Sequence, residues 1–166
     1  VGPDKIKIYL VDGNLSGTAF RDLPAGIMNG VKGTLPGAYP PADFQERLLA
    51  IDPTLTDFSY AAESYDAIML LALAAEIGGA TDGVTLAANL EDASKGGTKC
   101  YSWAECKGLL DEGTDIDYDG VSGPVEFDAD GEVTEATMGV YEYVANDNIE
   151  ARPEEFVVGA VPAPLP

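Results

Sequence analysis

Short apolar or alternating segments, each bounded by turn-forming residues, predict several β-strands in this sequence. The first segment, KIKIYLV at 5–11, places its three aliphatic residues Ile6, Ile8 and Leu10 on one face. It stops at Asp12-Gly13-Asn14, which reads as a turn. Other strands are predicted at 31–35, 125–127, 132–133, 138–144 and 156–161.

Helical spacing of apolar residues predicts helices at 41–49, 60–77 and 83–93, and another that starts at Ser102. The helix at 60–77 is apolar on nearly all sides after Tyr65, so we expect it to be buried between layers. Mixed helices and strands favour a layered α/β fold, although few clean βαβ units are visible.

The ends of these helices carry recognisable signals. Ser59 or Asp57 is the candidate N-cap of the longest helix, and Gly78-Gly79 ends it. Thr81 or Asp82 is the candidate cap of the third helix. The segment Ser102-Trp-Ala-Glu fits a capping box.

Composition narrows the function. The chain has 166 residues, about one domain, with 9 Lys+Arg against 29 Asp+Glu and a net charge of -20. Phosphate backbones repel such a chain, so nucleic acid is excluded as a partner. No histidine is present, which removes Ser-His-Asp triads and histidine-based zinc sites, and we expect no cofactor. The start at Val1-Gly2-Pro3 is expected for a mature chain or a piece of a longer one.

The two cysteines, Cys100 and Cys106, are six positions apart. Because the capping box starts a helix at Ser102, Cys100 lies in the preceding loop and can fold back toward Cys106. A disulfide closing this small loop would contribute about 2.4 kcal/mol and would indicate an oxidising compartment. Two unrelated thiols are the alternative.

One acidic segment matches the calcium-loop pattern D-x-D-x-D-G-x5-E. Its ligands would be the carboxylates of Asp115, Asp117, Asp119 and Glu126. An EF-hand needs a helix leaving the loop, whereas Pro124 stands at position ten. An acidic loop entering a strand is the alternative interpretation.

Three residues are candidates for ligand contact. Asp12 follows directly on the first strand, and ligands of open α/β sheets bind outside the carboxyl ends of strands. Its carboxylate would suit an ammonium group, or it belongs to an ordinary turn. Glu63 and Tyr65 lie at the start of the longest helix, where side chains can reach a cleft or simply occupy a helix face.

Several segments together resemble one family, in the same order along the chain. They are VDGNLS (11–16), GVKGTLPG (30–37), YDAIMLLALA (65–74), DYDGVSGP (117–124), FD (127–128) with Gly131, and GVYEYV (139–144). In combination they resemble type I periplasmic solute-binding proteins, which include the leucine/isoleucine/valine-binding receptors of ABC transporters. The resemblance covers nearly the whole chain and concerns the C-terminal portion of the family.

The resemblance implies an α/β fold of two Rossmann-like, three-layer lobes around a cleft, present here as an incomplete C-terminal fragment. Residues 1–37 would belong to the C-terminal lobe, 38–138 to the N-terminal lobe, and 139–166 would recross into the C-terminal lobe with a Pro-rich tail. The missing N-terminal part of the same protein would supply the first strands of both lobes. It would also make most of the contacts to the ligand carboxylate.

The family also sharpens the candidate site. In its amino-acid-binding members, an acidic residue at the position matching Asp12 contacts the ligand ammonium, and the helix start that matches Tyr60 to Tyr65 borders the cleft. Asp12, Glu63 and Tyr65 are therefore the expected ligand-binding residues. The Cys100–Cys106 pair fits an extracytoplasmic receptor.

The function implied is non-enzymatic. The protein would be a periplasmic or cell-surface receptor that binds a small amino-acid-like ligand between closing lobes. In one variant, the missing N-terminus would carry a lipid anchor. It would deliver that ligand to an ABC transporter permease. The alternatives are an extracellular calcium-binding module, or a carboxylate-based hydrolase, which needs two carboxyl groups at a fixed separation that no motif here marks.

Overall fold

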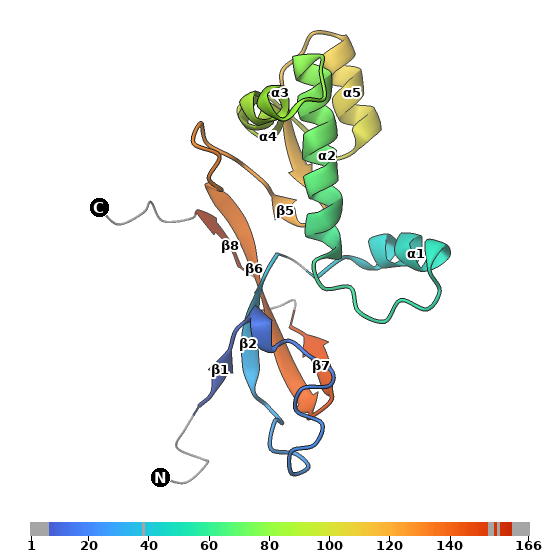
Figure 1. The fold of residues 1–166 in the computed structure, drawn as a ribbon, viewed down its shortest axis with the longest axis vertical. Helices are drawn as coiled ribbons and strands as arrows, with labels where there is room; N and C mark the ends of the chain where they lie inside the picture. The colour runs from blue at the N-terminus through green and yellow to red at the C-terminus, as the bar shows by residue number, and fades with distance from the viewer. Residues whose placement is uncertain (1–6, 38, 153–154, 156, 161–166) are drawn as a thin grey trace, which may run out of the picture. The chain divides into compact units, whose positions relative to one another are not determined.

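A computed structural model describes residues 7–37, 39–152, 155 and 157–160 of the chain (Figure 1). The chain divides into two compact units. Unit 1 contains Val1–Ala38 and Met138–Val157, and unit 2 contains Tyr39–Thr137 and Val158–Pro166. Each unit therefore combines segments that are distant in the sequence. The assignment of these segments to two lobes of a larger receptor stays a prediction.

A mixed sheet forms the frame of unit 1. Its strands follow the order β1 (Tyr9–Leu10), β2 (Lys32–Pro36), β6 (Glu135–Ala145) and β7 (Asn148–Ala151). Strand β8 (Val157–Ala160) falls mostly in unit 2. Strands β1 and β2 are parallel, whereas β2–β6 and β6–β7 are antiparallel. The strand predicted at the N-terminus is shorter than expected, and its first two residues lie outside the described residues.

The core of unit 1 follows from the alternation along β6, which puts Tyr141 and Tyr143 on one face of the sheet. These two rings pack with Met28 and Leu35 in a buried cluster. Gly33 pairs directly with Tyr141, and a Cβ at Gly33 would lie 2.2 Å from Cζ of the tyrosine ring. A glycine is required there because the ring lies flat against the neighbouring strand.

Unit 2 carries the α-helices of the described residues. They are α1 (Ala42–Ile51), α2 (Ala61–Gly78), α3 (Gly83–Ala88), α4 (Leu90–Ser94) and α5 (Trp103–Asp111). The helix predicted at 83–93 is thus divided at Asn89, whose side-chain amide donates to the carbonyl oxygen of Thr85. This bond competes with the regular helical pattern at the point of division.

The sheet of unit 2 was only partly expected from the sequence. Strand β3 (Thr98–Cys100) pairs in parallel with β4 (Ile116–Gly120), and β4 pairs antiparallel with β5 (Gly123–Pro124). Helix α5 connects the two parallel strands, so β3, α5 and β4 form a βαβ unit. The strands predicted at 125–127 and 132–133 are reduced to one isolated bridge between Phe127 and Val133.

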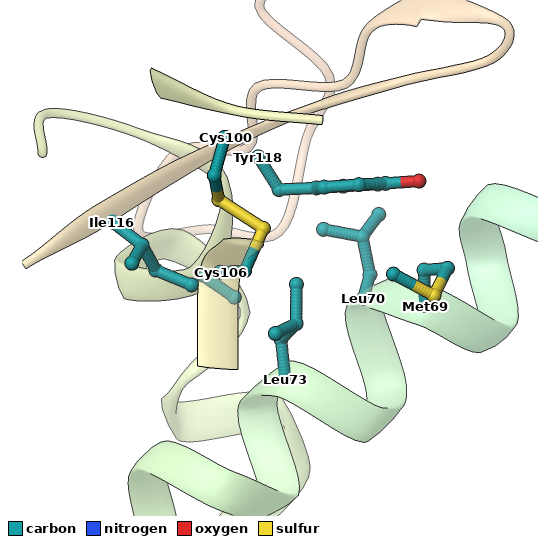
Figure 2. Close-up of a cluster of buried hydrophobic side chains, with 8 residues drawn as sticks. Met69, Leu70, Leu73, Cys100, Cys106, Ile116 and Tyr118 are labelled. Atoms are coloured by element: carbon teal, nitrogen blue, oxygen red, sulfur yellow. A yellow bond between two sulfur atoms is a disulfide. The ribbon is translucent and has the colours of Figure 1, made fainter. Parts of the chain in front are cut away.

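The core of unit 2 lies between helix α2 and the β3–α5–β4 unit. Figure 2 shows Leu70 and Leu73 of α2 pointing toward the disulfide and the ring of Tyr118. The disulfide joins Cys100 at the end of β3 to Cys106 of α5, as predicted, and both cysteines are fully buried. The bridge therefore fastens a strand to a helix inside the core.

Helix α2 departs from the prediction in two ways. Its apolar surface is not buried on all sides, because Ile68 is 66% exposed and Leu71 is 40% exposed. Its N-cap is Tyr60, in the left-handed conformation and without a side-chain cap, rather than Ser59 or Asp57. The sequence of the helix alone did not show which of its faces would pack against the core and which would be exposed to solvent.

Two predicted caps are present. The Asp82 carboxylate accepts hydrogen bonds from the backbone N–H groups of Val84 and Thr85 at the start of α3. At α5, Ser102 Oγ accepts from the Glu105 N–H at 3.3 Å, while Glu105 accepts in return from the N–H of Tyr101. The Ser102 bond of the predicted capping box is confirmed. The return bond to Glu105 comes from the N–H of Tyr101 instead of the N–H of Ser102.

Candidate functional site

Asp12 lies where the sequence places it, directly beyond the carboxyl end of β1. It begins a short 3-10 turn, Asp12–Asn14, and its side chain is exposed. The Leu15 N–H donates to the carbonyl oxygen of Asp12 at 2.8 Å and closes the turn. The carboxylate is therefore presented to the surroundings by an ordered turn.

Two buried tyrosines of β6 form hydrogen bonds with the backbone of this turn and its flanking residues. The Tyr141 hydroxyl donates to the carbonyl oxygen of Val11 at 2.9 Å. The Tyr143 hydroxyl lies 2.7 Å from the carbonyl oxygen of Asn14, and it accepts from the N–H of Ser16. Since both tyrosines are fully buried, these bonds fix the backbone on both sides of Asp12. The sequence offered no sign of this support.

Glu63 lies in the first turn of α2 and is half-buried. Its Oε1 atom is buried and has no hydrogen-bond partner among the described residues. Burial raises the pKa of the Glu63 carboxyl, and the nearby Asp66 carboxylate adds to this rise. A carboxyl oxygen in such a position gains from any donor that reaches it.

Tyr65 is half-buried and lies against helix α1. Its ring meets that of Phe44 edge to face, with centroids 5.3 Å apart. The guanidinium carbon of Arg47 lies 5.4 Å from both ring centroids. Tyr65 also packs against the core cluster of unit 2, so its ring has a fixed position.

The strongest polar centre of unit 2 is Asp66, which sequence reasoning did not single out. Its carboxylate is 1% exposed and accepts four hydrogen bonds. The donors are the Tyr118 hydroxyl, the N–H of Val121, and both the N–H and the hydroxyl of Ser122. A charged residue inside an apolar helix is the signal that could have identified it, because a buried carboxylate has to be hydrogen-bonded.

Asp66 also explains a glycine. A Cβ at Gly120 would lie 2.1 Å from Oδ2 of Asp66, too close for any side chain. The loop after β4 therefore approaches the first half of α2 with only backbone between them. The two sequence segments at 65–74 and 117–124 that carry the resemblance are joined by this contact.

The acidic segment at 115–126 contains the antiparallel pair of strands β4 and β5 and the turn between them. Asp117 and Asp119 lie on β4, and the ammonium of Lys99, on the neighbouring strand β3, is 3.0 Å from a carboxylate oxygen of each. Glu126 is 3.8 Å from the same ammonium. The Asp115 carboxylate instead accepts from the N–H of Ile116.

Lysine therefore occupies the position that a metal ion would take among these carboxylates. Burial by itself would lower the pKa of Lys99, but the hydrogen bonds to Asp119 and Asp117 outweigh it and raise this pKa above its ordinary value. In the part of the chain that the structure describes, no three His, Cys, Asp or Glu side chains are arranged to hold a metal ion. The calcium alternative stays a prediction, and in this structure the carboxylates of Asp117 and Asp119 are paired with Lys99.

A surface cavity of about 370 Å³ lies elsewhere in unit 2, between the end of α2 and the segment after α5. The lining residues are Glu76, Ile77, Leu110, Asp111, Gly113, Thr114 and Asp115. Lys107 forms ion pairs with both Glu76 and Asp111, so one positive charge is shared between two acidic groups of this cavity. None of the three predicted ligand residues is among the residues that line it.

The predicted ligand residues are divided between the two units. Asp12 belongs to unit 1, whereas Glu63 and Tyr65 belong to unit 2. On α2, Glu63 and Tyr65 are two positions apart, so their side chains leave the helix in different directions. Each unit therefore carries its own part of the predicted set.

The mixed α/β units, with parallel and antiparallel strands, define a fragment of a periplasmic-binding-protein-like fold of type I. Residues 40–146 match the model of the receptor family ligand binding region, and the chain belongs to this family. The family is a ligand-binding, non-enzymatic one. No curated protein and no solved structure gives a significant match to the chain.

Proposed function

We propose that this chain is part of an extracytoplasmic receptor that binds a small polar ligand, an amino acid, in a cleft between two lobes. The observation that carries the proposal is the family match over residues 40–146. The ordered, exposed carboxylate of Asp12 at the carboxyl end of β1 supports it, because such a group suits a ligand ammonium.

Glu63 supports the same chemistry from unit 2. Its buried Oε1 lacks a partner among the described residues, and an ammonium or hydroxyl donor would relieve the cost of burying it. We propose Asp12, Glu63 and Tyr65 as ligand contacts. The receptor would pass its ligand to an ABC transporter permease, and the remaining part of the binding fold would come from a preceding segment of the same protein.

The proposed location is extracytoplasmic. The family match and the buried disulfide Cys100–Cys106 both support it, since disulfides persist in oxidising compartments. None of the helices in the described ranges has the length and apolar character that crossing a membrane requires. In a lipid-anchored form of the receptor, the preceding segment of the same protein would carry the anchor.

Calorimetric titration with the twenty common amino acids, one at a time, tests the proposal, and it uses the chain produced together with the proposed preceding segment. At least one of them is expected to give saturable binding, and Asp12→Asn is expected to weaken it by about tenfold or more, since a hydrogen-bonded charge pair is lost. Asp22→Asn, an exposed aspartate of the same unit, is the matched control and should bind as the wild type does.

Two results would contradict the proposal. One is the absence of saturable heat for every amino acid, with the chain shown to be folded by circular dichroism. The other is unchanged affinity of Asp12→Asn, which would remove Asp12 from the site while leaving a binding function.

A further inference from the structure

Helices α1 and α2 together hold one arginine in a fixed place. Phe44 and Arg47 lie one turn apart on α1, and the guanidinium carbon lies 5.4 Å from the ring centroids of Phe44 and of Tyr65 on α2. Phe44 is buried and Tyr65 packs against the core. The cation therefore rests on two rings that cannot easily move, at a position fixed by packing.

Arg47 differs from the paired cations of the chain in resting on aromatic rings rather than beside a carboxylate. In a chain with 29 acidic residues, four of the cations have a carboxylate within 4 Å; they are Lys32, Lys99, Lys107 and Arg152. Arg47 has none among the described residues. Asp43 is four positions earlier on α1, where an ion pair would form readily, yet the two side chains do not pair.

A guanidinium held on aromatic rings keeps its charge and retains donors for a planar anion. It is less strongly hydrated than an ammonium and matches a carboxylate with two parallel hydrogen bonds. Arg47 is exposed, so such an anion can reach it. The buried network of Asp66 does not include Arg47.

We propose that Arg47 binds the carboxylate of the ligand, and that Phe44 and Tyr65 are positioning residues that hold its guanidinium. The ligand class rests on the proposed function, in which an amino acid is bound. Tyr65 thereby positions Arg47 in addition to making the ligand contact proposed for it.

The chain contains only three arginines, Arg21, Arg47 and Arg152, which makes a direct test practical. In isotope-labelled protein each gives its own side-chain Nε–H signal, assigned by substituting each arginine with lysine. Sodium acetate is titrated against sodium chloride at constant ionic strength. The Arg47 signal is expected to shift saturably with acetate, whereas Arg152, paired with Glu142 and Glu150, should stay in place.

Arg21 is the matched control for non-specific attraction, because it is exposed and has no carboxylate within 4 Å among the described residues. Its signal should change only slightly and without saturation. Tyr65→Phe keeps the ring and is expected to bind acetate like the wild type. Tyr65→Leu removes the ring and should weaken acetate binding about two- to fivefold. Equal, unsaturable shifts of Arg21 and Arg47 would overturn the proposal.

Calorimetry with amino acids separates this proposal from the receptor function. If an amino acid binds, Arg47→Lys is expected to weaken it about tenfold. Unchanged affinity together with an unmoved Arg47 signal would overturn the role of Arg47 and leave the receptor function intact. If acetate binds at Arg47 and no amino acid binds, the receptor function fails and the carboxylate site stands.

Discussion

At the scale of single residues, the structure is governed by a few polar groups placed inside apolar surroundings. Asp66 is the clearest case, because its carboxylate is fully buried and accepts its hydrogen bonds from neutral hydroxyl and backbone N–H groups. Four hydrogen bonds replace the water that this group would otherwise bind. The donors come from β4 and from the loop after it, so Asp66 ties helix α2 to the sheet.

Asp66→Asn is expected to destabilise the protein by about 3 kcal/mol, because the amide replaces one acceptor atom by a donor facing other donors. Urea unfolding followed by circular dichroism measures the free energy of unfolding. The matched control is Asp130→Asn, an exposed residue in a turn, which should change it little. A loss of less than about 1 kcal/mol in Asp66→Asn would contradict the role given to this carboxylate.

The second residue-scale prediction concerns pH. Burial raises the pKa of the Glu63 carboxyl above its ordinary value of 4.5, so the folded protein binds this proton more tightly than the unfolded chain does. The stability that Glu63 contributes is therefore present below that ordinary value and is lost as the pH rises through the raised pKa. Glu63→Gln removes this dependence.

The difference in melting temperature, Glu63→Gln minus wild type, is accordingly expected to increase as the pH rises from about 4 to about 7. Thermal unfolding by circular dichroism at several pH values measures it. Glu46→Gln, on the exposed side of α1, controls for the removal of one negative charge. A difference between Glu63→Gln and wild type that stays constant with pH, or falls, would show that Glu63 is not held in a desolvated position.

At the scale of elements, local signals and packing agree in some places and conflict in others. Ser102 caps α5 and Asp82 caps α3, as their sequence positions predict. Helix α2, by contrast, begins without a side-chain cap and leaves Ile68 and Leu71 exposed. Its position is determined by the core, in which Leu70 and Leu73 meet the disulfide, rather than by its own ends.

The disulfide leads to an element-scale prediction. Because Cys100 and Cys106 close a loop of only six positions, their bridge restricts the unfolded chain modestly, and its reduction should cost about 2 kcal/mol. Urea unfolding with and without a phosphine reductant measures the difference, after refolding in reductant because both cysteines are buried. The double variant Cys100→Ala, Cys106→Ala should not respond to reductant. An equally stable reduced protein would show that the bridge adds little to the β3–α5 contact.

At the scale of the whole molecule, charge is the dominant feature. With 29 acidic residues against 9 basic ones, repulsion between carboxylates opposes the folded state of either unit. The ion pairs of Lys99 and Lys107 relieve this only locally. The excess negative charge is consistent with a ligand that carries an ammonium group, although the charge by itself specifies no ligand.

The melting temperature is expected to rise as sodium chloride increases from about 10 mM to about 300 mM, because salt screens the net repulsion more than it weakens the few attractive pairs. Differential scanning calorimetry measures this. Sucrose at matched osmolality is the control for solvent effects unrelated to charge. A melting temperature that falls with salt would mean that attractive pairs outweigh the repulsion.

How much could be foreseen depends on the range of the interactions. Neighbouring residues in the sequence were enough to predict the placement of Asp12 after β1 and the pairing of Cys100 with Cys106. They also carried the resemblance at 65–74 and 117–124. The short strands β3 and β5 could not be predicted in this way, since a strand of two or three residues carries almost no pattern. The acidic segment matched a calcium loop because its spacing says nothing about which cation lies between the carboxylates.

Residues a few positions apart were enough to establish most helix and strand types, the family resemblance, the capped ends of α3 and α5, and the chemical character of the chain. Folding in three dimensions was needed to bring Lys99 between Asp117 and Asp119, and to bring Asp66 to Ser122, 56 positions away. The covered face of α2 was likewise settled by folding. Such contacts depend on how elements pack, and a charge pattern in one element does not specify the partner that another element brings to it.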